Sequence, residues 1–256
     1  MIGVALKEGK YLYCIINSKE SRSFGPLGIG ERGDEVYTVG FKDVAAVISN
    51  APMKKYPVSS DNVFAHEKAI EEVMKEHTVL PVRFATLTED EAKVKKILER
   101  EYDKFNDLLQ KMQNRKELGL KAIFKEEIIY QEILEKYKEI KSLKEAIASQ
   151  PPAKTYLQRM EIGKMVEQAL EKEKEIYKEA ILASLRPLAE DIKINNGYGE
   201  RMIINAAFLV NKDKESEFDQ KIQELDVHYG NKIKFKYVGT LPPFNFVNLV
   251  IETGNY

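Results

Sequence analysis

The sequence predicts an α+β fold, with two small α+β domains joined by long amphipathic helices. Runs rich in β-branched and aromatic residues fill the beginning of the chain and return near its end. Between them lie two long, charge-rich segments in which apolar residues recur at helical spacing. Within residues 66–86 the apolar spacing changes from helical to strand-like at Thr78, so this stretch joins both kinds of structure.

Three strands are expected at the beginning of the chain. The runs 10–16, 35–41 and 44–49 are β-branched or aromatic, and Lys42 and Asp43 form a plausible hairpin connection between the last two. Strand alternation places Leu12, Cys14 and Ile16 on one face, and we expect Cys14 to be a buried core residue rather than a nucleophile.

A glycine-rich stretch follows the first strand. Gly28, Gly30 and Gly33 superficially match the fingerprint of a dinucleotide-binding turn. That motif must follow a strand and begin a helix, whose N-terminus receives the pyrophosphate. Here a strand pattern comes next, so the glycines predict a loop.

The next elements complete the predicted N-terminal domain, residues 1–124. A helix capped near Ser59 leads into a short buried strand over 78–84. Thr88, with Glu91 three residues later, is typical of a capping box that opens a second helix, ending at about Arg115. A strand over 118–124 follows, and this order indicates a ferredoxin-like variant with its helices on one face of the sheet.

A helical linking region is predicted over residues 125–190. One helix covers 125–149 and is stopped by the two prolines at 151 and 152. A second runs from about residue 155 to 189. Its middle, residues 171–175, is charged on every side, so we expect that turn to be solvated or to bridge two bodies.

The remainder predicts a C-terminal ferredoxin-like α+β domain, residues 191–256, which can also take in the preceding long helix. The pattern contains four strands and one helix. The strands are expected at 191–195, 201–210, 232–238 and 245–251, with the helix at 213–225.

Charge and cysteine content narrow the functional classes. The chain has 40 basic and 41 acidic side chains, interleaved along the sequence, which gives no overall attraction to nucleic acid or to an anionic membrane. Its single cysteine allows no internal disulfide and favours a reducing compartment such as the cytoplasm. We find neither a secretory signal pattern nor an apolar run near the ~18 residues of a spanning helix.

The sequence predicts no catalytic, cofactor-binding or metal-binding residues. His66 and Glu67 begin like a zinc-binding HExxH motif, but Ile70 occupies the second histidine position. His66 and His77 share a helical stripe about 16 Å apart, too far for one metal ion. We expect His66, His77 and His228 to be helix-face or capping residues, and no nucleophile or phosphate-loop motif is present.

Cationic residues in strand-like runs leave two questions open. Arg83 is expected either to point outward and pair with a carboxylate or to anchor an interface. Lys232, Lys234 and Lys236 alternate with apolar residues, which indicates protection of an edge strand or, alternatively, an RNA-binding face.

Motifs in the same order along the chain resemble the gas vesicle protein F/L family. They are Val44–Ser49, His66-Glu67 with Thr78–Phe84, Thr155-Tyr156-Leu157-x-Arg159, Asn205–Val210 and Gly239–Val247. Two places depart from the family pattern. Ala85 stands where the family usually has glycine, and Thr240, Leu241 and Phe244 stand in a terminal signature usually closer to GPWPPYxF.

The resemblance implies a non-enzymatic minor structural or accessory protein of the gas vesicle. It would bind the small hydrophobic shell protein (GvpA-like) and other accessory proteins, assist nucleation and assembly, and lie at the gas-facing shell surface after a cytoplasmic stage. The residues expected to contact a partner are Arg83, Phe84, Leu241, Pro242, Pro243, Phe244 and Phe246. The alternatives are an enzyme with an unrecognised site in an α+β cleft, or the RNA-binding strand.

Overall fold

A computed structural model describes residues 7–251, and it confirms the α+β class. The chain forms two compact units: Met1–Glu117 together with Thr240–Tyr256, and Leu118–Gly239. These units are groups of residues in mutual contact, and they do not test the predicted domains. The division into residues 1–124, 125–190 and 191–256 stays a prediction. The ends of those predicted domains, residues 1–6 and 252–256, lie outside the described part of the chain.

The first unit, unit 1, is built on an antiparallel sheet. Its strands are β1 (Glu8–Asn17), β2 (Ser23–Gly25), β3 (Val36–Phe41), β4 (Val44–Pro52), β5 (Val79–Pro81) and β6 (Leu87–Thr88). The order is β2-β3-β4-β1-β5, and β6 also pairs with β1. The expected hairpin between β3 and β4 is confirmed, with Lys42 at a φ of 55° in its turn. The glycine-rich stretch is the predicted loop, in which Gly30 and Gly33 have positive φ.

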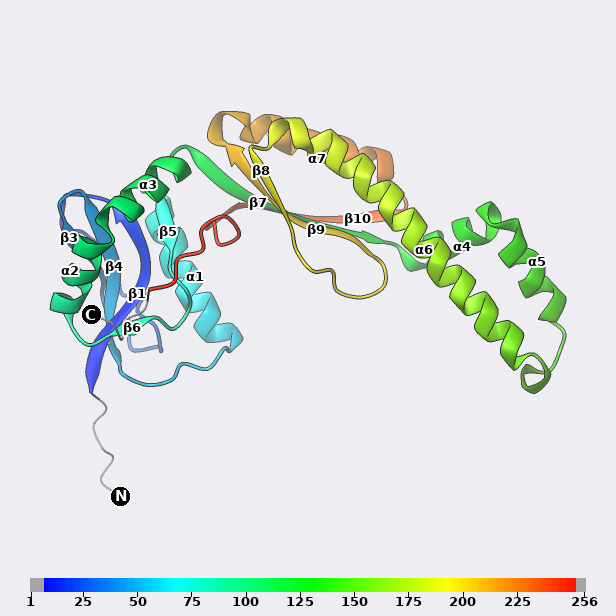
Figure 1. Cartoon of the computed structure of the whole chain (residues 1–256), viewed down its shortest axis with the longest axis horizontal. Helices are drawn as coiled ribbons and strands as arrows, with labels where there is room; N and C mark the ends of the chain where they lie inside the picture. The colour runs from blue at the N-terminus through cyan, green and yellow to red at the C-terminus, as the bar shows by residue number, and fades with distance from the viewer. Residues whose placement is uncertain (1–6, 252–256) are drawn as a thin grey trace, which may run out of the picture. The chain divides into compact units, whose positions relative to one another are not determined.

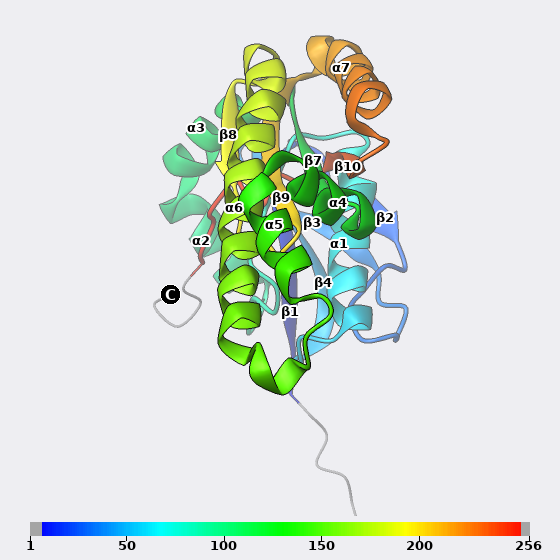
Figure 2. The ribbon, with the colours of Figure 1, turned by 90° about the vertical axis from the view of Figure 1, so that its right-hand side faces the viewer.

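Helices cover both faces of this sheet, so the expected one-face arrangement is wrong. The helices are α1 (Ser60–Met74), α2 (Glu91–Arg100) and α3 (Tyr102–Met112). Helix α1 packs on the face that carries Tyr11 and Tyr13, while α2 and α3 lie along the opposite face (Figures 1 and 2). The central strand is therefore buried on both sides, with Cys14 fully buried as predicted, and an alternating pattern cannot reveal which face a helix covers.

The boundaries around β5 and α2 differ from the prediction. Strand β5 ends at Pro81 rather than at residue 84, and the chain turns at Ala85, whose φ is 62°. Helix α2 is capped by Asp90, whose side chain accepts from the Lys93 amide at 2.8 Å, while Thr88 belongs to β6. The single helix expected up to residue 115 is broken at Glu101 into α2 and α3.

The second unit, unit 2, contains a four-stranded sheet of order β10-β7-β9-β8. Its elements are β7 (Arg115–Phe124), α4 (Glu126–Lys136), α5 (Lys138–Ile147), α6 (Tyr156–Leu185), β8 (Asp191–Ile194), β9 (Met202–Asn211), α7 (Glu215–Tyr229) and β10 (Ile233–Leu241). Helices α6 and α7 cover one face of this sheet (Figures 1 and 2). This is the βαββαβ order of a ferredoxin-like fold, with β7 as its first strand.

Two details of the helices in unit 2 correct the prediction. The helix expected over 125–149 is broken at Tyr137 into α4 and α5. The charged turn of α6 is not fully solvated, because Glu173 is buried. Its carboxylate accepts hydrogen bonds from Lys136 Nζ at 2.6 Å and from the Tyr137 hydroxyl at 2.7 Å. This pairing keeps a buried charge compatible with the helix contact.

The end of the chain belongs to unit 1 and is not the predicted strand over 245–251. After β10, Pro243 accepts from the amides of Phe246 and Val247, which closes a turn. Leu249 then forms an isolated parallel bridge with Val82, directly after β5. The sequence-distant stretches around residues 82 and 249 therefore run side by side.

Candidate functional site

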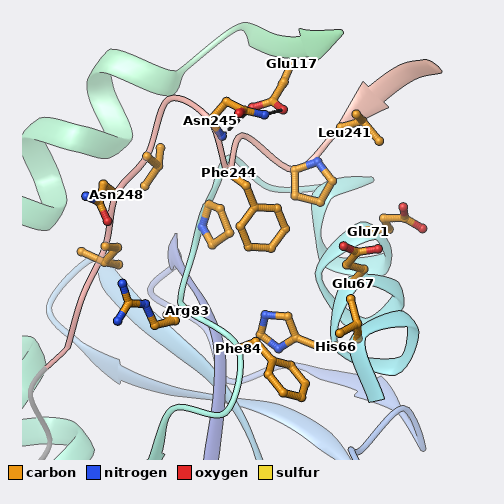
Figure 3. A pocket seen from close by; sticks show the side chains of 15 residues that line it. His66, Glu67, Glu71, Arg83, Phe84, Glu117, Leu241, Phe244, Asn245 and Asn248 are labelled. Atoms are coloured by element: carbon orange, nitrogen blue, oxygen red, sulfur yellow. Dashed lines mark hydrogen bonds between the residues drawn. The ribbon is translucent and has the colours of Figure 1, made fainter. Parts of the chain in front are cut away.

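Unit 1 contains a cavity of about 520 Å³ that brings three sequence segments together (Figure 3). One wall is helix α1, the second is the end of β5 and the turn after it, and the third is the end of β10 with the C-terminal segment that follows it; Glu117 of β7 is added to these. The lining residues are Val63, His66, Glu67, Glu71, Pro81, Arg83, Phe84, Glu117, Leu241, Pro242, Phe244, Asn245, Val247, Asn248 and Leu249.

The cavity gathers most of the residues expected to contact a partner. Its lining includes Arg83, Phe84, Leu241, Pro242 and Phe244. The other two, Pro243 and Phe246, are outside that lining: Pro243 is buried, and Phe246 is half-buried. The structure thus brings five of the seven together, and their contact with a partner stays a prediction.

Several lining residues were not predicted from the sequence. His66 was expected on a helix face, yet it is 2% exposed and packs among aromatic rings. Its ring centroid lies 5.7 Å from that of Phe84 and 6.2 Å from that of Phe244. Glu117 was missed because strand alternation alone does not distinguish a buried carboxylate from an outward one. The only available signal was an acidic residue at the start of an apolar run.

The surroundings of His66 determine which atom donates and which atom accepts in each of its hydrogen bonds. His66 Nε2 lies 3.2 Å from the Val82 carbonyl oxygen, which can only accept, so Nε2 carries the proton. Nδ1 of the neutral ring then accepts from the Tyr11 hydroxyl at 3.1 Å. The same hydroxyl oxygen accepts from the Ala85 amide at 2.8 Å. This buried chain ties β1, α1 and the turn after β5 to one another.

The surroundings keep His66 uncharged. Burial lowers the pKa of His66 to about 4, against a smaller opposing effect of the Val82 carbonyl. Burial also raises the pKa of Tyr11 well above its ordinary value, so its hydroxyl keeps its proton. Both ring nitrogens are engaged, which leaves no free lone pair for proton abstraction. We assign His66 a structural role beneath the cavity.

Glu117 holds the C-terminal turn in place. Its two carboxylate oxygens accept from Asn245, one from the backbone amide at 3.0 Å and the other from the side-chain amide at 2.6 Å (Figure 3). Burial raises the pKa of Glu117, and the two bonds from Asn245 oppose that shift. The turn is thereby held with Phe244 39% exposed at the cavity.

Charged groups stand on opposite sides of this apolar surface. Arg83 is exposed, as one of the two expectations has it, and the described residues 7–251 show no ion pair to it, so its carboxylate partner and its interface role both stay predictions. Glu67 and Glu71 line the α1 wall. Burial, and secondarily the charge of Glu71, raise the pKa of Glu67. Besides Glu117, which is bound to Asn245, the cavity therefore offers one cation, two carboxylates and an apolar floor between them.

This arrangement suits recognition of another molecule. In residues 7–251 there is no group of three or more His, Cys, Asp or Glu side chains able to hold a metal ion. His66 and Glu117 are both already engaged in hydrogen bonds within the chain. What remains accessible is apolar surface with a charge at either side, a composition typical of a site that takes an amphipathic segment.

The lysine-rich stretch in unit 2 agrees with one of its two expectations and weakens the other. Strand β10 is an edge strand, in agreement with the edge-protection hypothesis. Lys232, however, precedes the strand and bonds Glu132 Oε1 at 2.8 Å and the Tyr177 hydroxyl at 3.0 Å. Only Lys234 and Lys236 remain as an exposed cationic pair, which weakens the RNA-binding alternative.

Comparison with known proteins decides the family. A family model described as gas vesicle synthesis protein GvpL/GvpF matches residues 9–248. The chain belongs to this family. The GvpL/GvpF match spans both units and confirms the resemblance read from the sequence motifs.

Relatives extend over almost the whole chain. Gas vesicle protein F of Dolichospermum flosaquae is 27% identical over 242 residues, covering 93% of this chain and 97% of that protein. Gas vesicle protein F1 of Halobacterium salinarum is 24% identical and covers 96% of each chain. The crystal structure of GvpF from Anabaena sp. PCC7120 matches with a TM-score of 0.79 at 24% identity, covering 94% of this chain and 99% of that one. GvpF from Microcystis aeruginosa gives a TM-score of 0.75 at 23% identity, with the same coverage. The two crystal structures support the fold.

Membership of the GvpL/GvpF family supports an accessory role in gas vesicles. In the described part of the chain, the helices lack the combination of length and apolar content that crossing a bilayer requires.

Proposed function

We propose that this chain binds the small hydrophobic shell protein of the gas vesicle and assists nucleation and assembly of the shell. The observation that carries this proposal is the cavity of unit 1. It collects two family motifs that are far apart in sequence, around residues 78–84 and 239–247, onto one partly apolar surface. No catalytic role is needed, and we infer a non-enzymatic protein.

The cavity exposes a limited apolar surface, as the proposed role requires. A protein that keeps an aggregation-prone subunit from self-association must offer it apolar contacts without precipitating itself. Phe244 is 39% exposed, and Phe84 and Leu241 are half-buried, so the surface is apolar but small. Rigid support from Glu117 and His66 limits the entropy lost on binding.

The charges predict how a partner segment lies in the cavity. A segment with an apolar side chain over Phe244 can place an acidic residue near Arg83 and a basic residue near Glu67 and Glu71. Arginine suits this because its planar guanidinium pairs bidentately with a carboxylate. We extend the proposal to contact with other gas vesicle accessory proteins and to a final position at the gas-facing shell surface.

The proposal is tested by removing the gene for this chain from a set of genes that yields gas vesicles. We expect electron microscopy to show fewer or misshapen vesicles, with more of the shell protein in the insoluble fraction. Restoring the wild-type chain should reverse both effects. Unchanged vesicle number, shape and shell-protein solubility after deletion would rule the proposal out.

A further inference from the structure

The beginning of helix α6 exposes three large apolar side chains in unit 2. Tyr156, Leu157 and Met160 are 64%, 77% and 57% exposed. They share one side of the first helical turns, because Met160 lies four positions after Tyr156 and three after Leu157, the spacings at which side chains are neighbours on a helix. We call Tyr156, Leu157, Met160 and the next residue on that line, Gly163, the α6 face.

Hydrogen bonds of the buried Thr155 hold the start of helix α6 in place. Thr155 is fully buried, and its hydroxyl accepts from Arg159 Nε at 2.9 Å and donates to the Pro151 carbonyl at 3.3 Å. Thr155 and Arg159 are polar members of the Thr155-Tyr156-Leu157-x-Arg159 motif, one of those by which the sequence resembles the family. Their role is explained by the helix start, whereas the outward Tyr156 and Leu157 have no role in the packing of this unit.

The α6 face is turned away from the rest of the helical region. Met165 and Ala169, on the other side of α6, pack in the core cluster that includes Ile140 of α5. Figure 1 shows α5 running beside only one side of the first half of α6. Its exposed side is consequently free for contact with another molecule.

Gly163 is the observation that points to a close partner. It lies within α6, where glycine is among the least favourable residues. A Cβ placed on it would meet no described atom within 4 Å, so the packing of this chain does not require glycine here. A glycine on an exposed apolar helix face permits close approach of a second helix.

The charges along the same line favour a second copy of this chain. The line begins beside the cationic Lys154 and Arg159, passes Lys164 next to Gly163, and continues to Glu167 and Glu171. Only Glu171 of these two has an ion-pair partner in the described chain, Lys174 at 2.7 Å. An antiparallel copy sets the cationic beginning of each helix against the acidic continuation of the other, with Met160 over Gly163.

We propose that two copies associate through antiparallel contact of their α6 faces. Three side chains per copy provide an interface at the small end of specific interfaces. The dimer is therefore weak, with a dissociation constant on the order of tens to hundreds of micromolar. It does not involve the cavity of unit 1.

Sedimentation equilibrium of the full chain, over roughly 10 to 500 μM, measures this association directly. The wild-type chain is expected to show a reversible monomer–dimer equilibrium. Met160→Lys should weaken it by at least about tenfold, because it places a charge in the apolar contact. Val227→Lys is the matched control, since Val227 is 89% exposed on α7, and it should leave the equilibrium unchanged.

Gly163→Ala separates association from folding. Alanine favours the helix over glycine, so the melting temperature of the monomer, measured at low concentration, should rise. The dimer should weaken, because the added methyl group holds the helices apart. A monomer at all concentrations, equal association of wild type and Met160→Lys, or association only after shell protein is added would each overturn the proposal.

Discussion

Tyr11 connects three segments of unit 1 through a single hydroxyl. It accepts from the Ala85 amide and donates to His66, whose other nitrogen donates to Val82. The turn that supplies the Ala85 amide has a φ of 62° at that residue, a conformation that glycine adopts more readily. This φ gives a physical reason for the glycine that the sequence resemblance implies at this position, and the bond from the Ala85 amide to Tyr11 helps to hold alanine in the turn.

Removing the Tyr11 hydroxyl tests this network. Tyr11→Phe leaves the Ala85 amide and His66 Nδ1 without partners in a buried site, so we expect the free energy of unfolding to fall by about 2 kcal/mol. Urea unfolding measures the change. Tyr198→Phe is the control, because Tyr198 is 71% exposed, and it should alter stability by less than about 0.5 kcal/mol. Equal effects of the two substitutions would contradict the network.

The buried His66 also predicts a pH dependence of stability. Its pKa is about 4 in the folded chain against an ordinary 6.5, so between these values the unfolded chain binds the additional proton. Stability contributed at His66 is therefore lost as the pH falls from 6.5 towards 4, by up to about 3 kcal/mol.

Comparing the wild-type chain with His66→Gln isolates this effect. Both proteins retain His77, whose pKa is lowered mainly by burial and next by Arg22, so its contribution cancels in the difference. The unfolding free energy of the wild type should decrease more steeply than that of the variant between pH 6.5 and 4.5. Parallel curves would mean that His66 is protonated in the folded state at these pH values.

Among the elements, the start of α2 shows how a local sequence signal can mislead. Thr88 and Glu91 have capping-box spacing, yet Thr88 pairs with β1 through Lys10, and the helix starts two residues later at Asp90. The Thr88 hydroxyl is buried and has no hydrogen-bond partner in the described chain. Strand pairing, a tertiary effect, outweighs the local cap preference.

Two substitutions distinguish Asp90 from Thr88 as the residue that caps helix α2. Asp90→Ala should destabilise the chain by about 1 kcal/mol, because the Lys93 amide loses its acceptor. Thr88→Val should be neutral or stabilising by up to about 1 kcal/mol, because it removes an unpaired buried hydroxyl. Thermal unfolding measures both, and the reverse order of stabilities would restore Thr88 as the cap.

The elements predictable from sequence are those with strong local patterns. Strands β1, β3 and β4, helix α1 and most of α6 follow from apolar spacing and turn residues. The breaks at Glu101 and Tyr137 could not be predicted, since neither position carries proline or glycine. Burial of Glu173 also depends on partners in other segments, Lys136 and Tyr137, which spacing within α6 does not reveal.

At the scale of the whole molecule, the path of the chain explains the candidate site. The chain leaves unit 1 after Glu117 and returns to it at Thr240. This return brings Phe244 to His66, and the pair Glu117 and Asn245 secures it. Five lining residues were proposed as partner contacts from the motifs, but their meeting in one cavity was not predictable, because the C-terminal segment reads as a strand of a separate domain.

Co-purification of the shell protein with cavity variants tests the central claim most directly. Tagged wild-type chain and the control Val227→Lys should recover equal amounts of co-expressed shell protein. Phe244→Lys and Arg83→Glu should each recover about tenfold less, a loss of about 1.4 kcal/mol of binding free energy, while remaining folded by circular dichroism. Recovery at the wild-type level by both folded cavity variants would contradict the claim that this cavity binds the shell protein.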